Sequence, residues 1–221
     1  MKRSIIILLL ALTSSAVIHA QALGFRLATD FGLLRSFKKE QRFWAVGHTV
    51  QAQFHFAPKD AVYLWISYYT EGEFSNQLTA NAKSPIVFPQ NIAYRNDAAM
   101  RFKQFSVGFK KYLKGRFDME SNWNLYVYGG FGLVLGRVIN RHNPTIDTAD
   151  YDLPVREGKA NFKRLTLDLG GGVEYPIGAD IFLYTDGRLW VPTTDYPSRH
   201  IFVNENAPLA GMLNVGIRIL F

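Results

Sequence analysis

Residues 164–175 read RLTLDLGGGVEY, and their side chains alternate between two classes. Apart from Gly171, one set of alternate positions carries leucine, valine and tyrosine, whereas the other carries arginine, threonine, aspartate, glycine and glutamate. Successive side chains of a β-strand point to opposite faces. The segment is therefore predicted to be a strand with one apolar face and one face of small or charged residues.

The same period of two recurs along the chain. It is clear in residues 22–34, 44–56 and 209–221, although His48 interrupts the apolar face of the second of these segments. Four further segments have the β-branched and aromatic composition typical of strands, namely residues 61–69, 102–112, 123–138 and 181–191. The sequence therefore predicts an all-β chain of eight antiparallel strands.

The predicted connections alternate in length. Short links with Pro, Gly or Asp follow the second, fourth and sixth strands, at residues 58–60, 115–120 and 176–180. Longer links follow the odd strands, at residues 35–42, 70–101, 139–163 and 192–208. An up-and-down transmembrane β-barrel with short periplasmic turns and long extracellular loops has this alternation.

The N-terminus has the features of a secretory signal peptide. Lys2 and Arg3 precede an apolar run at residues 5–12, and small or polar residues follow up to Ala20. The run is too short to cross about 30 Å of hydrocarbon as a helix. We expect residues 1–20 to be removed, which leaves residues 21–221 as one barrel domain.

Composition narrows the functional classes. Hydrophobic residues make up 48% of the 221 residues and charged residues 19%, which excludes a disordered chain and a bundle of membrane helices. The chain has no cysteine, so lipoprotein acylation, disulfides and thiol chemistry are excluded. Its net charge of +7 is spread along the chain, and export makes nucleic acid an unexpected partner.

Two features indicate that the apolar faces point outward, toward lipid. Large aromatic residues lie near the ends of the predicted strands on the apolar side, namely Trp44, Phe56, Trp123, Tyr175 and Phe221, which matches the aromatic girdles of membrane barrels. The opposite faces combine glycines with charges, which suits a narrow interior. We expect a polar network in the lumen that comprises Arg26, Asp30, Gln51, Gln53, Arg164, Asp168, Glu174, Asp186, Arg188 and Arg218.

The last alternating segment finishes at Phe221. A terminal aromatic residue at this place resembles the signal by which the outer-membrane assembly machinery selects its substrates. Residues 21–221 resemble the small outer-membrane β-barrel family of the Bacteroidota type, within the OmpA-like and OmpX-like barrels. The resemblance implies a location in the bacterial outer membrane. It also implies contact with outer-membrane lipid, lipopolysaccharide and the assembly machinery, and it allows a further envelope protein as partner.

No motif predicts a catalytic residue, a cofactor or a metal site. The glycine clusters at residues 129–132 and 170–172 lack the GxGxxG spacing of phosphate-binding loops, so space in the lumen is the preferred explanation. The acidic residues Asp147, Asp150, Asp152 and Glu157 lack the spacing of an EF-hand. Lipid A 3-O-deacylases have a His-x-Ser arrangement followed by Asn, and this arrangement is not met by Ser198, His200 and Asn204.

The leading functional hypothesis is a non-enzymatic structural, adhesion or partner-binding protein that displays surface loops. The alternatives are a narrow pore for ions or solutes and a lipid A-modifying enzyme. The loop at residues 70–101 is richer in apolar side chains than a solvated loop needs, and we expect most of them to pack over the barrel mouth. These side chains are Phe74, Ile86, Val87, Phe88, Ile92 and Tyr94.

Overall fold

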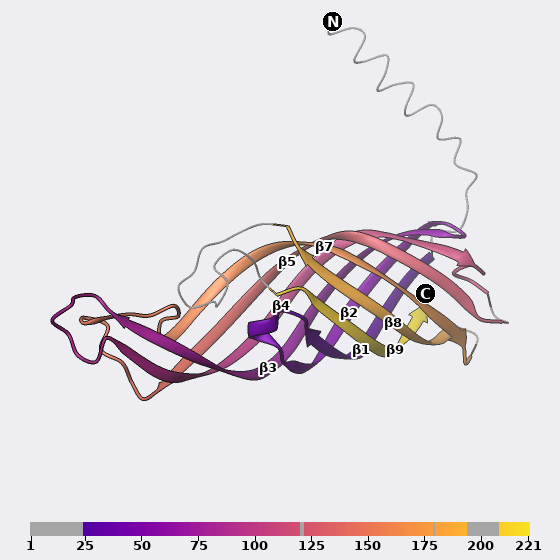
Figure 1. The fold of residues 1–221 in the computed structure, drawn as a ribbon. Coiled ribbons are helices and arrows are strands. Elements are labelled where there is room, and N and C mark those ends of the chain that lie inside the picture. Colours follow the sequence, from indigo (N-terminus) through magenta and orange to yellow (C-terminus); the bar gives the residue numbers. More distant parts are fainter. Residues whose placement is uncertain (1–23, 120–121, 179, 194–207) are drawn as a thin grey trace, which may run out of the picture.

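Eight long strands form a closed antiparallel ring in the computed structural model, which describes residues 24–119, 122–178, 180–193 and 208–221 (Figure 1). No helix among these residues is long and apolar enough to span a membrane. The elements are β1 Gly24–Ser36, the 3-10 turn η1 Lys39–Gln41, β2 Trp44–Ala57, β3 Asp60–Ala82, β4 Asn91–Lys114, β5 Asn124–Asn143, β6 Tyr151–Asp152, β7 Gly158–Pro176, β8 Ile181–Pro192 and β9 Ala210–Leu220.

The ring runs in the order β2-β1-β9-β8-β7-β5-β4-β3, and a β2–β3 pairing closes it. The first and last strands meet along a long seam, from Arg26 opposite Leu220 to Ser36 opposite Ala210. Strand β6 pairs only with the far end of β3. The eight-stranded antiparallel barrel predicted from the sequence is therefore confirmed.

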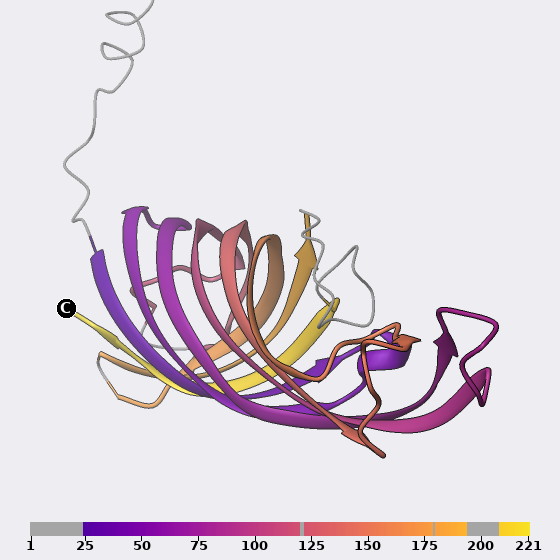
Figure 2. The ribbon, with the colours of Figure 1, turned by 90° about the vertical axis from the view of Figure 1, so that its left-hand side faces the viewer.

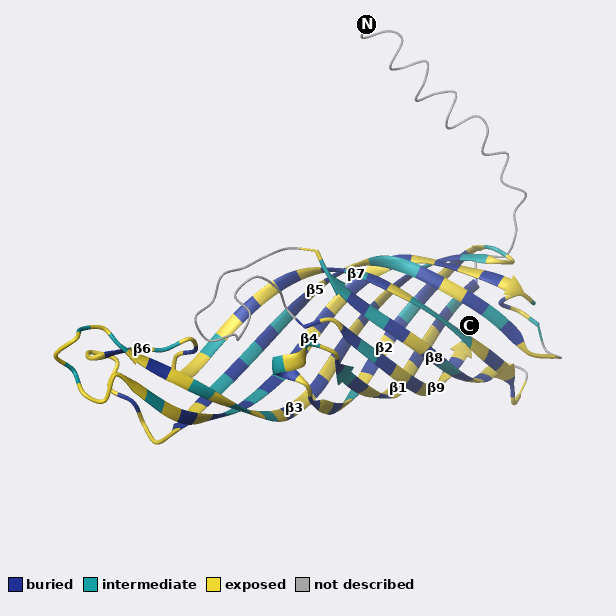
Figure 3. Cartoon of the chain, viewed as in Figure 1, coloured by how far each residue is buried: buried dark blue, intermediate teal, exposed yellow. Residues whose placement is uncertain are grey.

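The two faces of the wall have the orientation that the alternation predicted. On β1, Arg26 and Asp30 are at most 1% exposed, whereas Phe31, which follows Asp30 and points outward, is 77% exposed. Buried and exposed residues alternate in the same way along the other strands of the wall (Figure 3). The apolar face lies outside and the polar face inside.

The five aromatic residues expected at the strand ends all have exposed side chains. Trp44 begins β2 at the end of the barrel that carries the long connections. The other four lie at the end with the short turns, beside the ends of β2, β5, β7 and β9, and are Phe56, Trp123, Tyr175 and Phe221. Their placement at the two rims is that of residues at the interfaces of a membrane.

The segment at residues 70–101 is not a loop, and this prediction was wrong. Strands β3 and β4 continue as a hairpin, paired from Gly72 opposite Met100 to Asn81 opposite Asn91. Strand β5 follows β4 as far as Arg95 opposite Asn143. We call residues 72–82, 91–100 and 139–143 the β3–β4–β5 extension, which projects beyond the ring (Figures 1 and 2). On β3 the outward residues Glu73, Ser75 and Gln77 are polar, whereas the opposite face carries Phe74 and Leu78. The apolar face is therefore no longer the outward one, and the alternation that marks membrane strands is lost there.

The expectation that the apolar residues of this segment pack over the barrel mouth was also wrong for most of them. Only Phe74 reaches the barrel, where its ring stacks 5.9 Å from that of Phe43. Ile86 and Phe88 are 85% and 79% exposed at the tip. The rest join a separate small core with the segment around β6, which contains Leu78, Ala80, Val87, Ile92, Tyr94, Ile146, Tyr151 and Leu153.

The barrel interior has layers rather than a uniform polar lining. Near the long connections it holds an apolar cluster, whose largest members are Phe43, Tyr69, Met100, Phe102, Phe162 and Trp190. Near the short turns it holds an aromatic cluster of Tyr63, Trp65, Tyr112, Phe117, Tyr126 and Tyr128. The inward face is therefore more aromatic than the sequence pattern predicted, because side chains from opposite walls fill the narrow lumen.

Adjacent glycines of β5 provide a matched test of this packing. A Cβ on Gly130 would lie 2.3 Å from the Val107 carbonyl oxygen and 2.5 Å from the Tyr63 hydroxyl, whereas a Cβ on Gly129 would meet nothing closer than 3.5 Å. We expect Gly130→Val to destabilise the barrel by about 3 kcal/mol and Gly129→Val to change its stability little. Urea titration in detergent, followed by the heat-dependent gel shift of the folded form, measures this. Equal midpoints for both variants would contradict the packing described.

Candidate functional site

All ten polar residues expected in the lumen are buried, with at most 4% of each residue exposed. They come from five strands, β1, β2, β7, β8 and β9. Most of them gather into three groups, centred on Glu174, Arg188 and Asp168. Arg164 lies apart from these groups, with its guanidinium donating to the Lys163 carbonyl oxygen (2.7 Å) and lying 5.3 Å from the ring of Phe162.

Glu174 is the centre of the group nearest the short turns. Its Oε1 accepts hydrogen bonds from Arg26 Nη1 at 2.8 Å and from the Tyr112 hydroxyl at 2.8 Å. Its Oε2 accepts from Lys110 Nζ at 3.4 Å and also from Arg218 Nη1. One carboxylate from β7 therefore contacts three cations, which come from β1, β4 and β9.

Aromatic rings also stabilise these three cations, in addition to hydrogen bonds such as that from Lys110 Nζ to Gln53 Oε1 (3.3 Å). The guanidinium of Arg26 lies 4.0 Å from the ring centroid of Phe182, and that of Arg218 lies 4.3 Å from the ring centroid of Tyr184. Lys110 Nζ lies 3.7 Å from the ring centroid of Tyr126. Cation–π contacts strengthen where water is excluded, so the rings lower the cost of enclosing three positive charges with one negative charge.

Arg188 is the centre of the second group. It contacts Asp30 Oδ2 at 2.5 Å through Nη2, Asp186 Oδ1 at 3.1 Å through Nε, and Thr49 Oγ1 at 3.0 Å through Nη1. The two carboxylates have further donors, the Tyr184 hydroxyl to Asp30 (2.8 Å) and Asn214 Nδ2 to Asp186 (2.8 Å). Here one cation is shared by two anions, which is the reverse of the arrangement at Glu174.

Asp168 is held by neutral donors. Gln104 Nε2 donates to both carboxylate oxygens at 2.8 and 2.9 Å, Thr166 donates at 2.7 Å, and Ser106 donates as well. Gln104 is oriented in turn by Trp65, whose ring nitrogen donates to its Oε1 at 3.1 Å. Hydrogen bonds from neutral side chains therefore stabilise the carboxylate at this position.

The sequence reasoning missed several members of these groups. Lys110, Gln104 and Ser106 lie on β4, and Asn124 on β5 donates to Glu174 at 3.1 Å. A signal for the β4 residues was present, because Phe105, Val107 and Phe109 alternate with them on the outer wall. The interior residues of β4 were overlooked because the segment as a whole fitted the period less cleanly.

Glycines provide the room for these groups, as the sequence interpretation proposed. A Cβ on Gly132 would lie 2.5 Å from Asp168 Oδ2, and a Cβ on Gly172 would lie 2.5 Å from the Cβ of Asp186. Space for neighbouring side chains therefore explains the inward glycines of the two clusters, which are Gly130, Gly132, Gly170 and Gly172. An eight-stranded barrel is only wide enough to be filled by its own side chains.

The arrangement is suited to sealing and stiffening the barrel. Among the described residues, no group of three His, Cys, Asp or Glu side chains is placed to hold a metal ion. His55 is buried and stacks 4.4 Å from the ring of Phe117, whereas His48 lies on the outer wall and bonds to Thr29 Oγ1 at 2.7 Å. The deacylase-like candidates Ser198, His200 and Asn204 lie outside the described residues.

The Glu174 group generates a stability prediction. Glu174→Gln keeps the size of the side chain but leaves Arg26, Lys110 and Arg218 without a counter-ion, so we expect a loss of about 3–5 kcal/mol in the free energy of unfolding. Urea titration of the barrel in detergent measures it.

The matched control is Asp60→Asn, which breaks the exposed contact with Lys111 (3.1 Å). Exposed ion pairs contribute about 0–1 kcal/mol, so this variant should unfold close to the wild type. Adding Lys110→Met to Glu174→Gln should restore part of the lost stability. A Glu174→Gln protein as stable as the wild type would show that Glu174 does not neutralise the three cations.

No known family model matches the sequence, and no curated protein matches it either. Solved structures do match. Neisserial surface protein A is 14% identical and has a TM-score of 0.55, with 89% of this chain and 97% of that chain covered. OprG, an outer membrane protein of Pseudomonas aeruginosa, is 12% identical with a TM-score of 0.51, with 91% and 97% covered.

A third match is Ail, the attachment invasion locus protein of Yersinia pestis, in complex with the heparin analogue sucrose octasulfate. It is 9% identical and has a TM-score of 0.50, with 91% of this chain and 100% of that chain covered. At such identities the likeness concerns the fold, and the narrower Bacteroidota type stays a prediction. The chain has the fold of the small bacterial outer-membrane β-barrels, and the outer membrane is the location that this fold and the apolar outer wall indicate.

Proposed function

We propose that this protein is a non-enzymatic outer-membrane anchor that holds the β3–β4–β5 extension outside the cell as an adhesive or partner-binding surface. The observation that carries the proposal is the construction of the extension. It is a continuation of three barrel strands, with a small core of its own at the tip. Eleven residues of β3 beyond the ring correspond to roughly 35 Å of strand.

The tip of the extension is braced by the segment around β6. The Tyr151 hydroxyl donates to the Pro89 carbonyl oxygen (2.9 Å), and Lys83 Nζ donates to the Thr148 carbonyl oxygen (2.6 Å). Ile86 and Phe88 remain exposed on this braced tip. A pre-organised surface with exposed apolar residues loses little conformational entropy when it binds a partner, which favours a contact role.

The dimensions of the outer wall support the membrane position. On β7 the apolar wall runs from Tyr175 to Leu165, which is roughly 33 Å along the strand. At a strand tilt of about 45° this corresponds to roughly 23 Å along the membrane normal, close to the band of about 25 Å on outer-membrane barrels. Because short turns face the periplasm in such barrels, the extension points away from the cell.

The remaining elements of the proposal concern export and assembly. Residues 1–20 are proposed as a signal peptide and lie outside the described residues. Phe221 is proposed to take part in recognition by the assembly machinery. Its exposed ring lies 6.0 Å from that of Phe25 on the neighbouring strand. Lipopolysaccharide is the proposed neighbour of the outer rim, since it forms the outer leaflet of this membrane.

A pore is disfavoured by the filled interior, and planar-bilayer recording tests it. The lumen is filled by the apolar cluster near the long connections, the three polar groups and the aromatic cluster near the short turns. We therefore expect purified protein to give no steady single-channel openings, while a sixteen-stranded porin in the same bilayer conducts. Large, stable openings that depend on the folded protein would contradict a sealed lumen and favour transport.

Surface labelling tests the display of the extension. The chain has no cysteine, so a single introduced one is a unique reporter. We expect Phe88→Cys at the tip to react with a membrane-impermeant maleimide on intact cells, because the side chain is exposed at the end of the extension.

The control is Lys59→Cys in the turn between β2 and β3, at the opposite end of the barrel. It should react only after the outer membrane has been permeabilised. Labelling of position 59 but not of position 88 on intact cells would reverse the proposed orientation and overturn the display function.

A further inference from the structure

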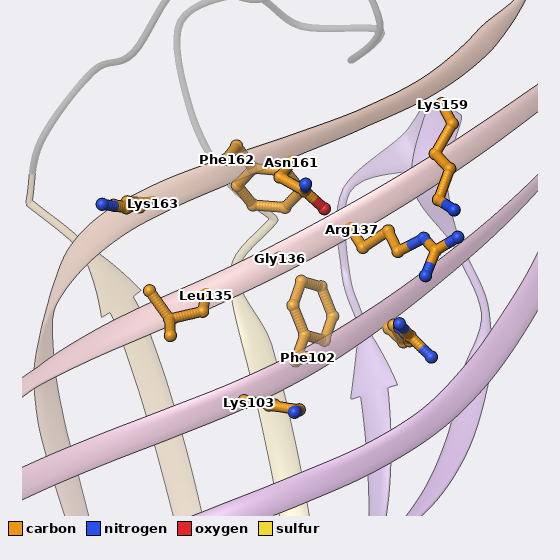
Figure 4. Close-up of a pocket in the computed structure, with 10 residues that line it drawn as sticks. Phe102, Lys103, Leu135, Gly136, Arg137, Lys159, Asn161, Phe162 and Lys163 are labelled. Atoms are coloured by element: carbon orange, nitrogen blue, oxygen red, sulfur yellow. The ribbon is translucent and has the colours of Figure 1, made fainter.

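A basic groove of about 710 Å³ lies on the outer wall where β4, β5 and β7 leave the ring (Figure 4). Five cationic side chains line it together with Leu135, Asn161 and the backbone of Gly136, above the rings of Phe102 and Phe162. We call these residues the basic groove, and its cations are Arg101, Lys103, Arg137, Lys159 and Lys163. No carboxylate is among its lining residues.

The charges of the basic groove are almost uncompensated within the part of the chain that the structure describes. Arg101 approaches Glu71 only to 4.0 Å, and the other four cations make no ion pair there. Arg137 Nε is buried without a hydrogen-bond partner in the same residues. Figure 4 shows the side chains of Arg137 and Lys159 converging. Like charges gathered on neighbouring strands are unfavourable unless an anion lies between them.

The position of the basic groove relative to the apolar wall is defined by strand register. Lys103 on β4 pairs with Leu135 on β5, which pairs with Lys163 on β7. One outward row closer to the short turns, the corresponding residues are Phe105, Leu133 and Leu165, all exposed and apolar. The cations therefore begin directly where the apolar wall stops, at the depth of the lipid headgroups.

Further along the extension, the outer face carries both acidic and basic side chains. Asp97 there accepts hydrogen bonds from Arg95 Nε at 2.7 Å and from Ser75 Oγ at 2.6 Å, and Glu71 and Glu73 line the same surface. Positive and negative charges are thus mixed beyond the headgroup level, where water is the solvent. On the outer face of β4, β5 and β7, the cations of the basic groove therefore lie between the apolar wall and this mixed surface.

We propose that the basic groove binds the phosphate groups of a phosphorylated glycolipid of the lipid A class, whose acyl chains lie against the apolar wall below. The inference rests on the proposed outer-membrane position and adds a specific lipid site to it. Arginine and lysine form short, charge-assisted hydrogen bonds with phosphate oxygens. Cations from three adjacent strands present several donors to a headgroup that carries phosphates on a sugar. A soluble phosphate would gain nothing from the adjoining Phe105, Leu133 and Leu165.

Native mass spectrometry of the full-length folded barrel in detergent, titrated with lipid A that carries two phosphates, tests the site. The test variant is Lys103→Gln, Arg137→Gln and Lys163→Gln combined. The control variant removes the same charge at the same end of the barrel, as Lys38→Gln, Lys39→Gln and Arg42→Gln beside β2. We expect the test variant to bind lipid A about tenfold or more weakly, and the control variant to bind like the wild type.

Two further probes distinguish a lipid site from a general anion site. Dephosphorylated lipid A should bind the wild type as weakly as intact lipid A binds the test variant. Inorganic phosphate at millimolar concentration should compete only weakly. Equal loss of lipid A binding in the test and control variants would show a general charge effect and overturn the site. Unchanged lipid A binding by the test variant would also overturn the site. Displacement by inorganic phosphate alone would overturn the assignment to lipid.

Failure of this inference is separable from failure of the display function. The maleimide experiment reports which end of the barrel faces outward, whereas lipid titration in detergent reports only the chemistry of the groove. Correct surface labelling together with no phosphate-dependent lipid binding would leave the display function standing and remove the lipid site. Reversed labelling would remove the display function whatever the titration shows.

Discussion

Pairing of every backbone amide and carbonyl across a closed ring is the constraint on which the rest of this molecule depends. Hydrocarbon supplies no hydrogen-bond partner, so a sheet can cross it only if the sheet has no edge. The seam between β1 and β9 removes the last edges, and all neighbours in the ring are antiparallel. Once the ring is closed, each side chain belongs either to lipid or to a narrow interior.

The narrowness of that interior explains its chemistry. Eight strands leave room only for the side chains themselves. Glycines leave room for the side chains of nearby strands, as Gly132 on β5 does for Asp168 on the neighbouring β7. Charges enclosed in this way must be compensated by other interior side chains, because water cannot do so. Glu174 with its three cations and Arg188 with its two carboxylates are complementary solutions to this requirement.

Outside the membrane, water can pair with backbone groups, so the sheet need not be closed there. The residue types on the outer face change with the surrounding solvent. Along β4 the outward residues pass from Phe105 through Lys103 and Arg101 to Asp97, which is a change from apolar to cationic to mixed charge. The pairing of β4 with β5 continues without a register shift through all three zones, and that of β3 with β4 continues with one bulge between Tyr69 and Gly72. A single sheet thereby serves as the membrane wall, as the proposed lipid contact and as the support of an exposed tip.

Local alternation was enough to establish the outward apolar face and the burial of residues such as Arg26, Asp168 and Arg218, because a period of two assigns a side chain to a face without reference to any partner. The number of strands also depended on composition, by which four of the eight segments were assigned. The length of the β3–β4 hairpin could not be predicted in this way, because a bulge between Tyr69 and Gly72 shifts the alternation and the outward face beyond it is polar. Contacts across the lumen could not be predicted from local alternation either. That Glu174 meets Arg26, Lys110 and Arg218 depends on ring closure and register, which bring residues far apart in the chain into one enclosed space.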